Sequence, residues 1–349
     1  AVVFTLLSVC LFAAMVFFAR PISVLMQAPA EAVTLTTSYV RICGSGIFFI
    51  VAYNLLSAIF RGLGDSKSPL LFVLVACIVN IVGDLALVGI FGMGANGAAI
   101  ATVFSQGFSA YLAVVYARRA DYHFDFKLAS MRIKWDKLVN LLRIGLPMAV
   151  QFSLTSISFI FILATVSKMG GVAAAAAIGI TGKLNGFTML PPHSFAAAIS
   201  AMVAQNIGAG KPKRARSTMF HGLAISLAFG VVTFAALFFF PEPVIRIFTP
   251  DRELIDATAL YLKSFSIDCV LVCLVFCLNG FFNGCGHTTF TMMNNIFCAF
   301  AVRVPATWIL SGIAGASLFT IGFAAPLASL LTIVISLWFL KSGKWKTPR

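Results

Sequence analysis

Residues 69–91 read PLLFVLVACIVNIVGDLALVGIF, an apolar run that contains one acidic or basic residue, Asp84. An α-helix needs about 20 apolar residues to cross the ~30 Å hydrocarbon core of a bilayer, and it satisfies its own backbone hydrogen bonds there. Strands of a membrane barrel are instead ~10-residue segments that alternate in polarity. The run therefore predicts a transmembrane helix with a carboxylic acid inside it.

Comparable apolar runs recur along the 349 residues, of which 60% are hydrophobic and 10% are charged. A soluble globular protein of this size does not have this balance. The expected spans are residues 2–19, 36–60, 69–91, 95–117, 141–167, 172–207, 219–240, 258–282, 288–312 and 317–340. The sequence thus predicts an all-α integral membrane protein, a polytopic bundle of about ten transmembrane helices.

The net charge of +14 follows the expected topology, because most of the 25 basic residues fall in segments on one side of the membrane. These segments are residues 61–67, 118–143 and 211–216 and the tail from residue 341. The positive-inside rule places them in the cytoplasm. We therefore expect a multi-pass protein of the plasma or inner membrane, with lipid as its surroundings and no nucleic-acid partner.

An internal repeat appears when the chain is shifted by 222 residues against itself. The matched pairs are Phe17 with Phe239, Pro21 with Pro243, Tyr39 with Tyr261, Arg41 with Lys263, Phe60 with Phe282, Gly62 with Gly284, Gly64 with Gly286 and Ser66 with Thr288. Both copies read as helix, outer loop with proline, helix and Gly-x-Gly turn. The repeat predicts two pseudo-symmetric lobes that run in the same direction.

The lobes are unequal in length. We assign residues 1–117 to a first lobe of four helices, 118–140 to a basic cytoplasmic linker, and 141–349 to a second lobe of six helices with a basic tail. Because Ala1 aligns with Leu223, two helices that precede this position in the second lobe have no counterpart in the first. We expect a complete form with twelve helices, and the alternative is a native protein of ten helices.

Asp84 is the first candidate for function, since an acid at membrane depth is costly and usually has a role. Asn80 lies one helical turn away on the same face. Asp84 and Thr102 are each nine residues from Met93 in the following turn, so in a helical hairpin both lie ~13 Å below the turn. Their oxygens could bind a proton or a hard monovalent cation. Equally, Asp84 could be protonated and only hydrogen-bond the two helices together.

Asp268 is the second acid inside an expected span. It could contact a cationic substrate or form a second ion site, and the sequence also offers an ion pair with Lys183 or Arg303, both of which need a partner at depth. We favour the ion pair.

Groups expected of an enzyme or a metal centre are missing from the sequence. The spans contain no paired acids, histidine cluster or Ser–His pair at catalytic spacing. Cys269, Cys273 and Cys277 share a helix face and could suit a soft metal, but small packing residues are the simpler interpretation. We expect no enzymatic activity, no metal and no cofactor apart from a coupling ion.

Five short motifs in order resemble those of the multidrug and toxic compound extrusion (MATE) transporters. They are RGLGDSKSP (61–69), NIVGD (80–84), GAAIAT (97–102), GLP (145–147) and QNIGAGK (205–211). The resemblance covers essentially the whole chain from the family's third helix onward. It implies that Asn80, Asp84 and Thr102 correspond to positions that bind Na⁺ or H⁺ in relatives that couple through the first lobe.

Two features of the family pattern are missing here. A fourth ion-binding residue, an aspartate, comes from the family's first helix, which precedes this sequence. Some relatives also have a glutamate in the seventh helix, where residues 151–158 contain no acid. The first-lobe site is therefore expected to be incomplete as given, and a coupling site in the second lobe is in doubt.

The function expected from these observations is secondary active multidrug efflux by alternating access, with antiport of H⁺ or Na⁺. The expected substrates are small amphipathic, often cationic organic compounds, and the expected state is a monomer. One alternative is a flippase for lipid-linked precursors, which needs a more cationic cavity than Lys183 and Arg303 provide. The other is an inactive fragment of a transporter.

Overall fold

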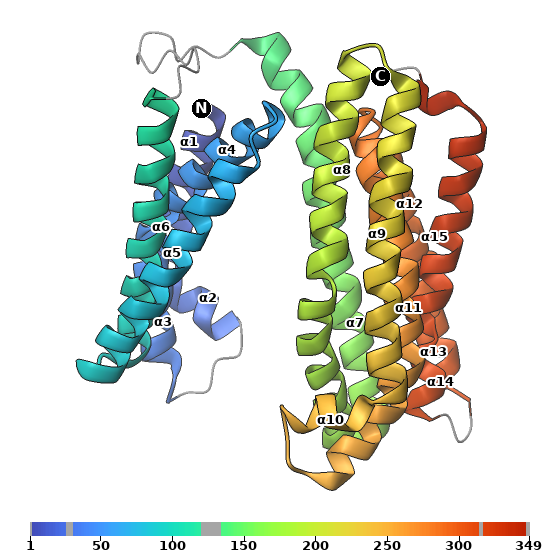
Figure 1. The fold of residues 1–349 in the computed structure, drawn as a ribbon. Helices are drawn as coiled ribbons and strands as arrows, with labels where there is room; N and C mark the ends of the chain where they lie inside the picture. Colours follow the sequence, from blue (N-terminus) through green and yellow to red (C-terminus); the bar gives the residue numbers. More distant parts are fainter. Residues whose placement is uncertain (1, 26–30, 120–133, 314–316, 347–349) are drawn as a thin grey trace. The chain divides into compact units, whose positions relative to one another are not determined.

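A computed structural model describes residues 2–25, 31–119, 134–313 and 317–346 (Figure 1). The chain divides into two compact units, residues 1–138 and 139–349. The expected linker falls largely on residues 120–133, which lie outside the described ranges.

The first unit is built from helices only, as far as it is described. Its elements are α1 (Val2–Phe17), α2 (Ala19–Leu25), α3 (Val33–Ser45), α4 (Ile47–Gly62), α5 (Lys67–Asp84), the π-helix η1 (Leu85–Ile90) and α6 (Gly94–Arg119). The chain bends by 74° between α1 and α2 and by 47° between α3 and α4. Residues 36–60, expected as one helix, are therefore a bent pair that meets at Gly46, whose missing side chain lets the chain approach α6 closely.

The second unit holds the remaining helices. Its elements are α7 (Trp135–Thr188), which begins just before the boundary, α8 (Leu190–Gly208), α9 (Pro212–Phe239), α10 (Pro241–Arg246), α11 (Arg252–Gly284), α12 (Thr288–Cys298), the π-helix η3 (Ala299–Arg303), α13 (Val304–Ser311), α14 (Leu318–Gly322), α15 (Ala324–Lys341) and the 3₁₀ turn η4 (Lys344–Lys346). The expected break at residues 168–171 falls within α7, where an alanine-rich stretch with high helix propensity follows.

Within the described ranges, eight helices are long and apolar enough to cross a membrane, or up to ten if each bent pair is one span. This confirms the all-helical, polytopic membrane fold. The spans differ in their surroundings: 72% of the most apolar stretch of α11 is buried, against 6% for the span of α5 with η1. Helix α11 is therefore the centre of its unit, whereas α5 presents most of its surface to the outside.

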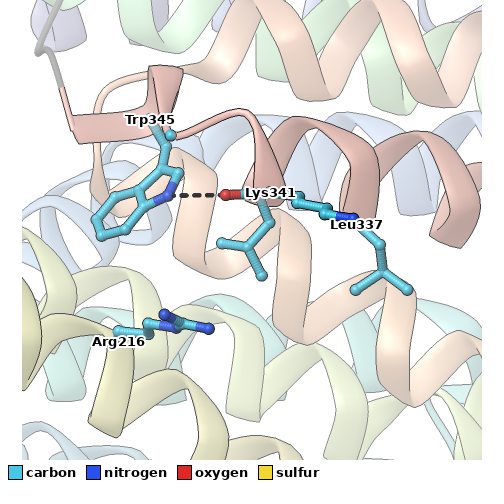
Figure 2. A pocket seen from close by; sticks show the side chains of 6 residues that line it. Arg216, Leu337, Lys341 and Trp345 are labelled. Atoms are coloured by element: carbon cyan, nitrogen blue, oxygen red, sulfur yellow. Dashed lines mark hydrogen bonds between the residues drawn. The ribbon is translucent and has the colours of Figure 1, made fainter.

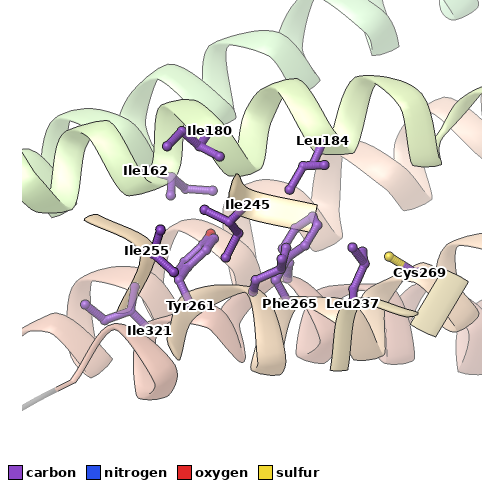
Figure 3. Packing of buried hydrophobic residues seen from close by; sticks show 12 residues of the cluster. Ile162, Ile180, Leu184, Leu237, Ile245, Ile255, Tyr261, Phe265, Cys269 and Ile321 are labelled. Carbon is purple, nitrogen blue, oxygen red and sulfur yellow. The ribbon is translucent and has the colours of Figure 1, made fainter. Parts of the chain in front are cut away.

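Two apolar clusters surround α11. One contains Leu237 and Ile245 together with Tyr261 and Phe265 of α11 (Figure 3). The other joins Phe281 and Phe282 to residues of α8 and α9 and to Trp345. In the first unit a smaller cluster forms around Phe60, whose ring meets that of Tyr116 at 5.6 Å. Each unit thus has its own core.

The two Gly-x-Gly turns have the same backbone geometry. Gly64 and Gly286 have positive φ angles of 94° and 86°, which favour glycine because it has no Cβ. The amide of Asp65 donates to the carbonyl of Phe60 at 2.9 Å, and the amide of His287 donates to that of Phe282 at the same distance. The sequence repeat is therefore also a repeat of local structure.

Asp65 joins two helices of the first unit at this turn. Its carboxylate accepts a hydrogen bond from the Ser68 amide at 3.1 Å and one from the Tyr116 hydroxyl at 3.0 Å. Slight desolvation raises the pKa of Asp65, but the hydrogen bonds from Ser68 and Tyr116 outweigh it and leave the pKa below its ordinary value. The carboxylate therefore links the start of α5 to α6.

Candidate functional site

Asp84 is the last residue of α5 and directly precedes the π-helix η1. Its Oδ1 atom is buried and has no hydrogen-bond partner among the described residues, and the same holds for Nδ2 of Asn80 one turn earlier. A buried polar atom without a partner costs about 1–3 kcal/mol. Short π-helical segments occur frequently at functional sites. Asn80 and Asp84 therefore form a pair of polar groups that can still bind a ligand.

Helix α6 approaches α5 at the level of Asp84. A Cβ added to Gly83 would lie 3.0 Å from the Cβ of Ala101, so the two backbones are close at this point. Thr102 follows Ala101 directly, and its hydroxyl donates to the carbonyl of Ala98 at 2.9 Å. The hydroxyl oxygen can still accept a hydrogen bond or contact a cation. The structure thus brings Asp84 and Thr102 to neighbouring positions on adjacent helices.

The bend between α3 and α4 lies against the same part of α6. A Cβ added to Gly46 would lie 2.6 Å from Cγ2 of Val103, the residue after Thr102. On α3, the side chain of Tyr39 interacts mainly with Cys43, and the charge of Asp84 has a smaller effect on its hydroxyl. The described part of the site therefore has three walls: α5, α6 and the bent pair.

Tyr39 was missed as a site residue by the sequence analysis. The signal that could have found it is the repeat, because Tyr39 matches Tyr261, and Tyr261 is close enough to Asp268 to interact with its charge. A tyrosine at the same position of both copies is thus near an intramembrane acid in each unit.

Asp268 lies in the middle of α11 and is 3% exposed. Its Oδ1 atom has no hydrogen-bond partner within the described part of the chain, while Ser329 of α15 interacts with the carboxylate. Arg303, the last residue of η3, acts electrostatically on Asp268. Of the two candidate bases, Arg303 is the one whose charge acts on this acid, whereas Lys183 is exposed on α7.

No group of three or more His, Cys, Asp and Glu side chains that could hold a metal ion occurs among the residues described. Cys269 and Cys273 are buried, and the Cys273 thiol donates to the carbonyl of Cys269 at 3.2 Å. These thiols pack within the helix bundle at α11.

Comparison with known proteins assigns a family. The MatE family profile matches residues 1–86 and 147–309. The probable multidrug resistance protein YpnP of Bacillus subtilis is 26% identical over 352 residues, which cover 100% of this chain and 77% of YpnP. The probable multidrug resistance protein NorM of Thermotoga maritima is 28% identical over 88% of this chain and 67% of its own length.

A solved structure has the same fold. An outward-facing multidrug resistance MATE family transporter of the MOP superfamily superposes with a TM-score of 0.93 at 21% identity, over 99% of this chain and 78% of that one.

Proposed function

The chain belongs to the MatE family of membrane transporters, and we propose that it exports small amphipathic, often cationic organic compounds in exchange for H⁺ or Na⁺. The family consists of transporters and not of enzymes. The observation that carries the proposal is the buried Oδ1 atom of Asp84, an acceptor without a hydrogen-bond partner among the described residues. It lies inside a helix that otherwise presents an apolar surface.

The coupling ion binds, in this proposal, to the carboxylate of Asp84, with oxygens of Asn80 and Thr102 beside it. A proton would neutralise the acid, and Na⁺ would use all three oxygens. The ion can shift the lobe between two shapes only if it binds them unequally. Such a difference is physically reasonable here, because the site adjoins a helix pair bent by 47° at Gly46 and a π-helix.

The substrate class comes from the relatives. YpnP and NorM are both named as probable multidrug resistance proteins. The chain has 35 Phe and 11 Met, and such polarizable side chains can adapt to varied apolar cations. We therefore propose organic cations with a large apolar surface as substrates.

Asp268 and Arg303 have another role in this proposal. The charge of Arg303 acts on the buried Asp268, so the second unit has a cation of its own available to this acid. We therefore propose that Asp268 pairs with Arg303 and that the exchangeable ion binds at Asp84.

The proposed membrane orientation follows the distribution of basic residues. It places the segment 118–140 and the C-terminal tail in the cytoplasm, in a protein of the plasma or inner membrane.

Drug accumulation in cells that express the full-length protein tests the proposal. Cells with the wild-type protein should accumulate less ethidium than cells without it, and Asp84→Asn should abolish this difference while the protein still reaches the membrane. Glu242→Gln, which removes an exposed acid of α10, serves as the control and should leave export unchanged. Undiminished export by Asp84→Asn would overturn the proposal.

A further inference from the structure

A cavity of about 310 Å³ lies at one end of the second unit, well away in sequence from Asp84 and Asp268 (Figure 2). Its lining residues are Arg216, Leu337, Leu340, Lys341, Gly343 and Trp345. One water molecule occupies ~30 Å³ in the liquid, so the cavity has room for a small polar group such as a phosphoglycerol.

The beginning of α9, the end of α15 and the turn that follows α15 form this cavity. Arg216 comes from the beginning of α9, and Lys341 is the last residue of α15. Gly343 then adopts a positive φ of 72°, which reverses the chain. Trp345 is thereby buried against Phe281, with ring centroids 4.9 Å apart, and its indole N–H donates to the Leu340 carbonyl at 3.1 Å. The wall of the cavity is therefore fixed by packing and a hydrogen bond.

Two cations face this cavity without a carboxylate to balance them. Arg216 and Lys341 are both exposed, and within the described ranges neither forms an ion pair. The sequence explains this, because it has no Asp or Glu between residues 137 and 241 and none after Asp268. The Arg216 guanidinium stands over the ring of Phe220, 5.5 Å from its centroid, which holds the charge near the cavity. The neighbouring stretches of α9 and α15 therefore supply no acidic side chain to either cation.

The apolar side of the cavity distinguishes a lipid from a soluble anion. Leu337 is 49% exposed, and the adjacent Trp338 is 66% exposed on the same helix. Exposed tryptophan is typical of the level where the bilayer meets water. An anion bound between the two cations at this level would have acyl chains beside Leu337. Basic pockets between transmembrane helices on the cytoplasmic side are known binding sites for lipid head groups.

We propose that this cavity binds the phosphodiester head group of an anionic phospholipid of the adjoining leaflet. Arg216 and Lys341 contact the phosphate, since guanidinium and ammonium groups are its usual partners. Leu337 and Leu340 lie against the upper part of an acyl chain.

Native mass spectrometry of the purified full-length protein tests the assignment. Phosphatidylglycerol should bind more tightly than phosphatidylcholine with the same acyl chains. A hydrogen bond to a charged group contributes roughly tenfold or more to binding, so Arg216→Gln with Lys341→Gln, which removes both contacts to the phosphate, should weaken the tight site about a hundredfold. The charge-matched control, Lys211→Gln with Lys213→Gln, removes two cations from the same end of α9 outside the cavity, leaves both contacts in place and should weaken binding much less.

Competition experiments distinguish a membrane lipid from a soluble phosphate as the bound anion. Inorganic phosphate and glycerol phosphate should not displace phosphatidylglycerol, because neither carries the acyl chain that contacts Leu337. Displacement by either one, or equal losses in the cavity variant and the control variant, would overturn the proposal.

A measurement on the wild-type protein covers the case in which the double variant does not fold. Photoreactive phosphatidylglycerol in native membranes should cross-link to the peptide that contains residues 337–345. Labelling spread evenly over the lipid-facing helices, with no enrichment in this peptide, would contradict the site. Arg216→Lys with Lys341→Arg, which retains both charges, should keep the enrichment.

Discussion

The bent pair α3–α4 and the continuous helix α11 are two copies of one sequence pattern, and one of their differences lies at the bend. Gly46, where the first copy bends by 47°, matches Asp268 in the second copy. In the first unit the glycine lets the chain lie against Val103, and the acid is on a neighbouring helix as Asp84. In the second unit the acid lies in the helix itself, and the charge of Arg303 acts on it.

One repeat can therefore serve two purposes. In the first unit Asp84 lies next to a bend and a π-helix and forms no ion pair within the described ranges, as we expect of an exchangeable ion site. The second copy has an acid with a fixed cation on a helix that is largely buried. We therefore expect changes in the second copy to affect stability and changes at Asp84 to affect transport.

Arg303→Met should have the largest effect on stability, because it leaves the buried Asp268 carboxylate without its cation. Removing one partner of a buried pair costs about 3–5 kcal/mol. The measurement is thermal unfolding in detergent or nanodiscs. Asp268→Leu combined with Arg303→Met should recover most of the loss, since apolar replacement of a whole pair is often neutral. If the two single effects simply add in the double variant, the residues do not form a pair.

Gly280→Ala should cause the second-largest loss of stability, and Gly46→Ala the third-largest. A Cβ at position 280 would lie 2.5 Å from the backbone oxygen of Ala196, which cannot rotate away, whereas a Cβ at position 46 would meet the movable side chain of Val103 at 2.6 Å. Overpacking of this kind costs about 1–3 kcal/mol, and the smaller part of that range applies to Gly46.

The unfolding midpoints of Gly280→Ala and Gly46→Ala, each compared with the wild-type protein, show which substitution destabilises more. Val103→Ala should rescue Gly46→Ala because it removes the clashing atoms. Gly62→Ala is the matched control in α4, where nothing lies within 4 Å of an added Cβ, and it should be neutral or slightly stabilising. A loss in Gly62→Ala as large as in Gly46→Ala would show that helix contact is not the cause.

Asp65→Asn should have the smallest effect on the free energy of unfolding, and the effect should be present over only part of the pH range. Because the folded-state pKa of Asp65 is below its unfolded value, its contribution is fully present above about pH 4 and is lost as the pH falls through the folded-state pKa. The expected loss is about 1 kcal/mol or less, since the side chain is partly exposed to water.

The pH dependence of unfolding measures this contribution. Tyr116→Phe should remove part of it by deleting the hydrogen bond of 3.0 Å to the carboxylate. At the matching position the second unit has His287, whose ring packs against Phe339 at 5.5 Å. If the loss of stability between neutral and acidic pH is as large in Asp65→Asn as in the wild-type protein, another titratable group causes it.

Much of the helical architecture could be predicted, because a membrane span needs a long apolar run that is visible in the sequence. The turn at Gly64 and Gly286 was indicated by the repeat, since a positive φ requires glycine at the same position of each copy. The bend at Gly46 could not be predicted, because it depends on contact with Val103 on another helix. The π-helices η1 and η3 have no distinctive composition, and the sequence analysis did not find them.

The candidate site shows the same limit. Asn80 and Asp84 could be paired from their spacing on one helix, and the hairpin register placed Thr102 close by. Tyr39 and the choice of Arg303 over Lys183 depend on how separate helices pack, which spacing along the sequence does not determine. The repeat contained a partial signal for Tyr39 in its match to Tyr261.

The most direct test of ion coupling at Asp84 is ethidium transport by the full-length protein in vesicles with an imposed pH or Na⁺ gradient. We expect one of the two gradients to drive transport by the wild-type protein, and Asp84→Asn to lose the response. Asp268→Leu with Arg303→Met should keep it, because that pair supplies no exchangeable ion. A gradient response that survives in Asp84→Asn but disappears in the double variant would contradict the assignment of coupling to the first unit.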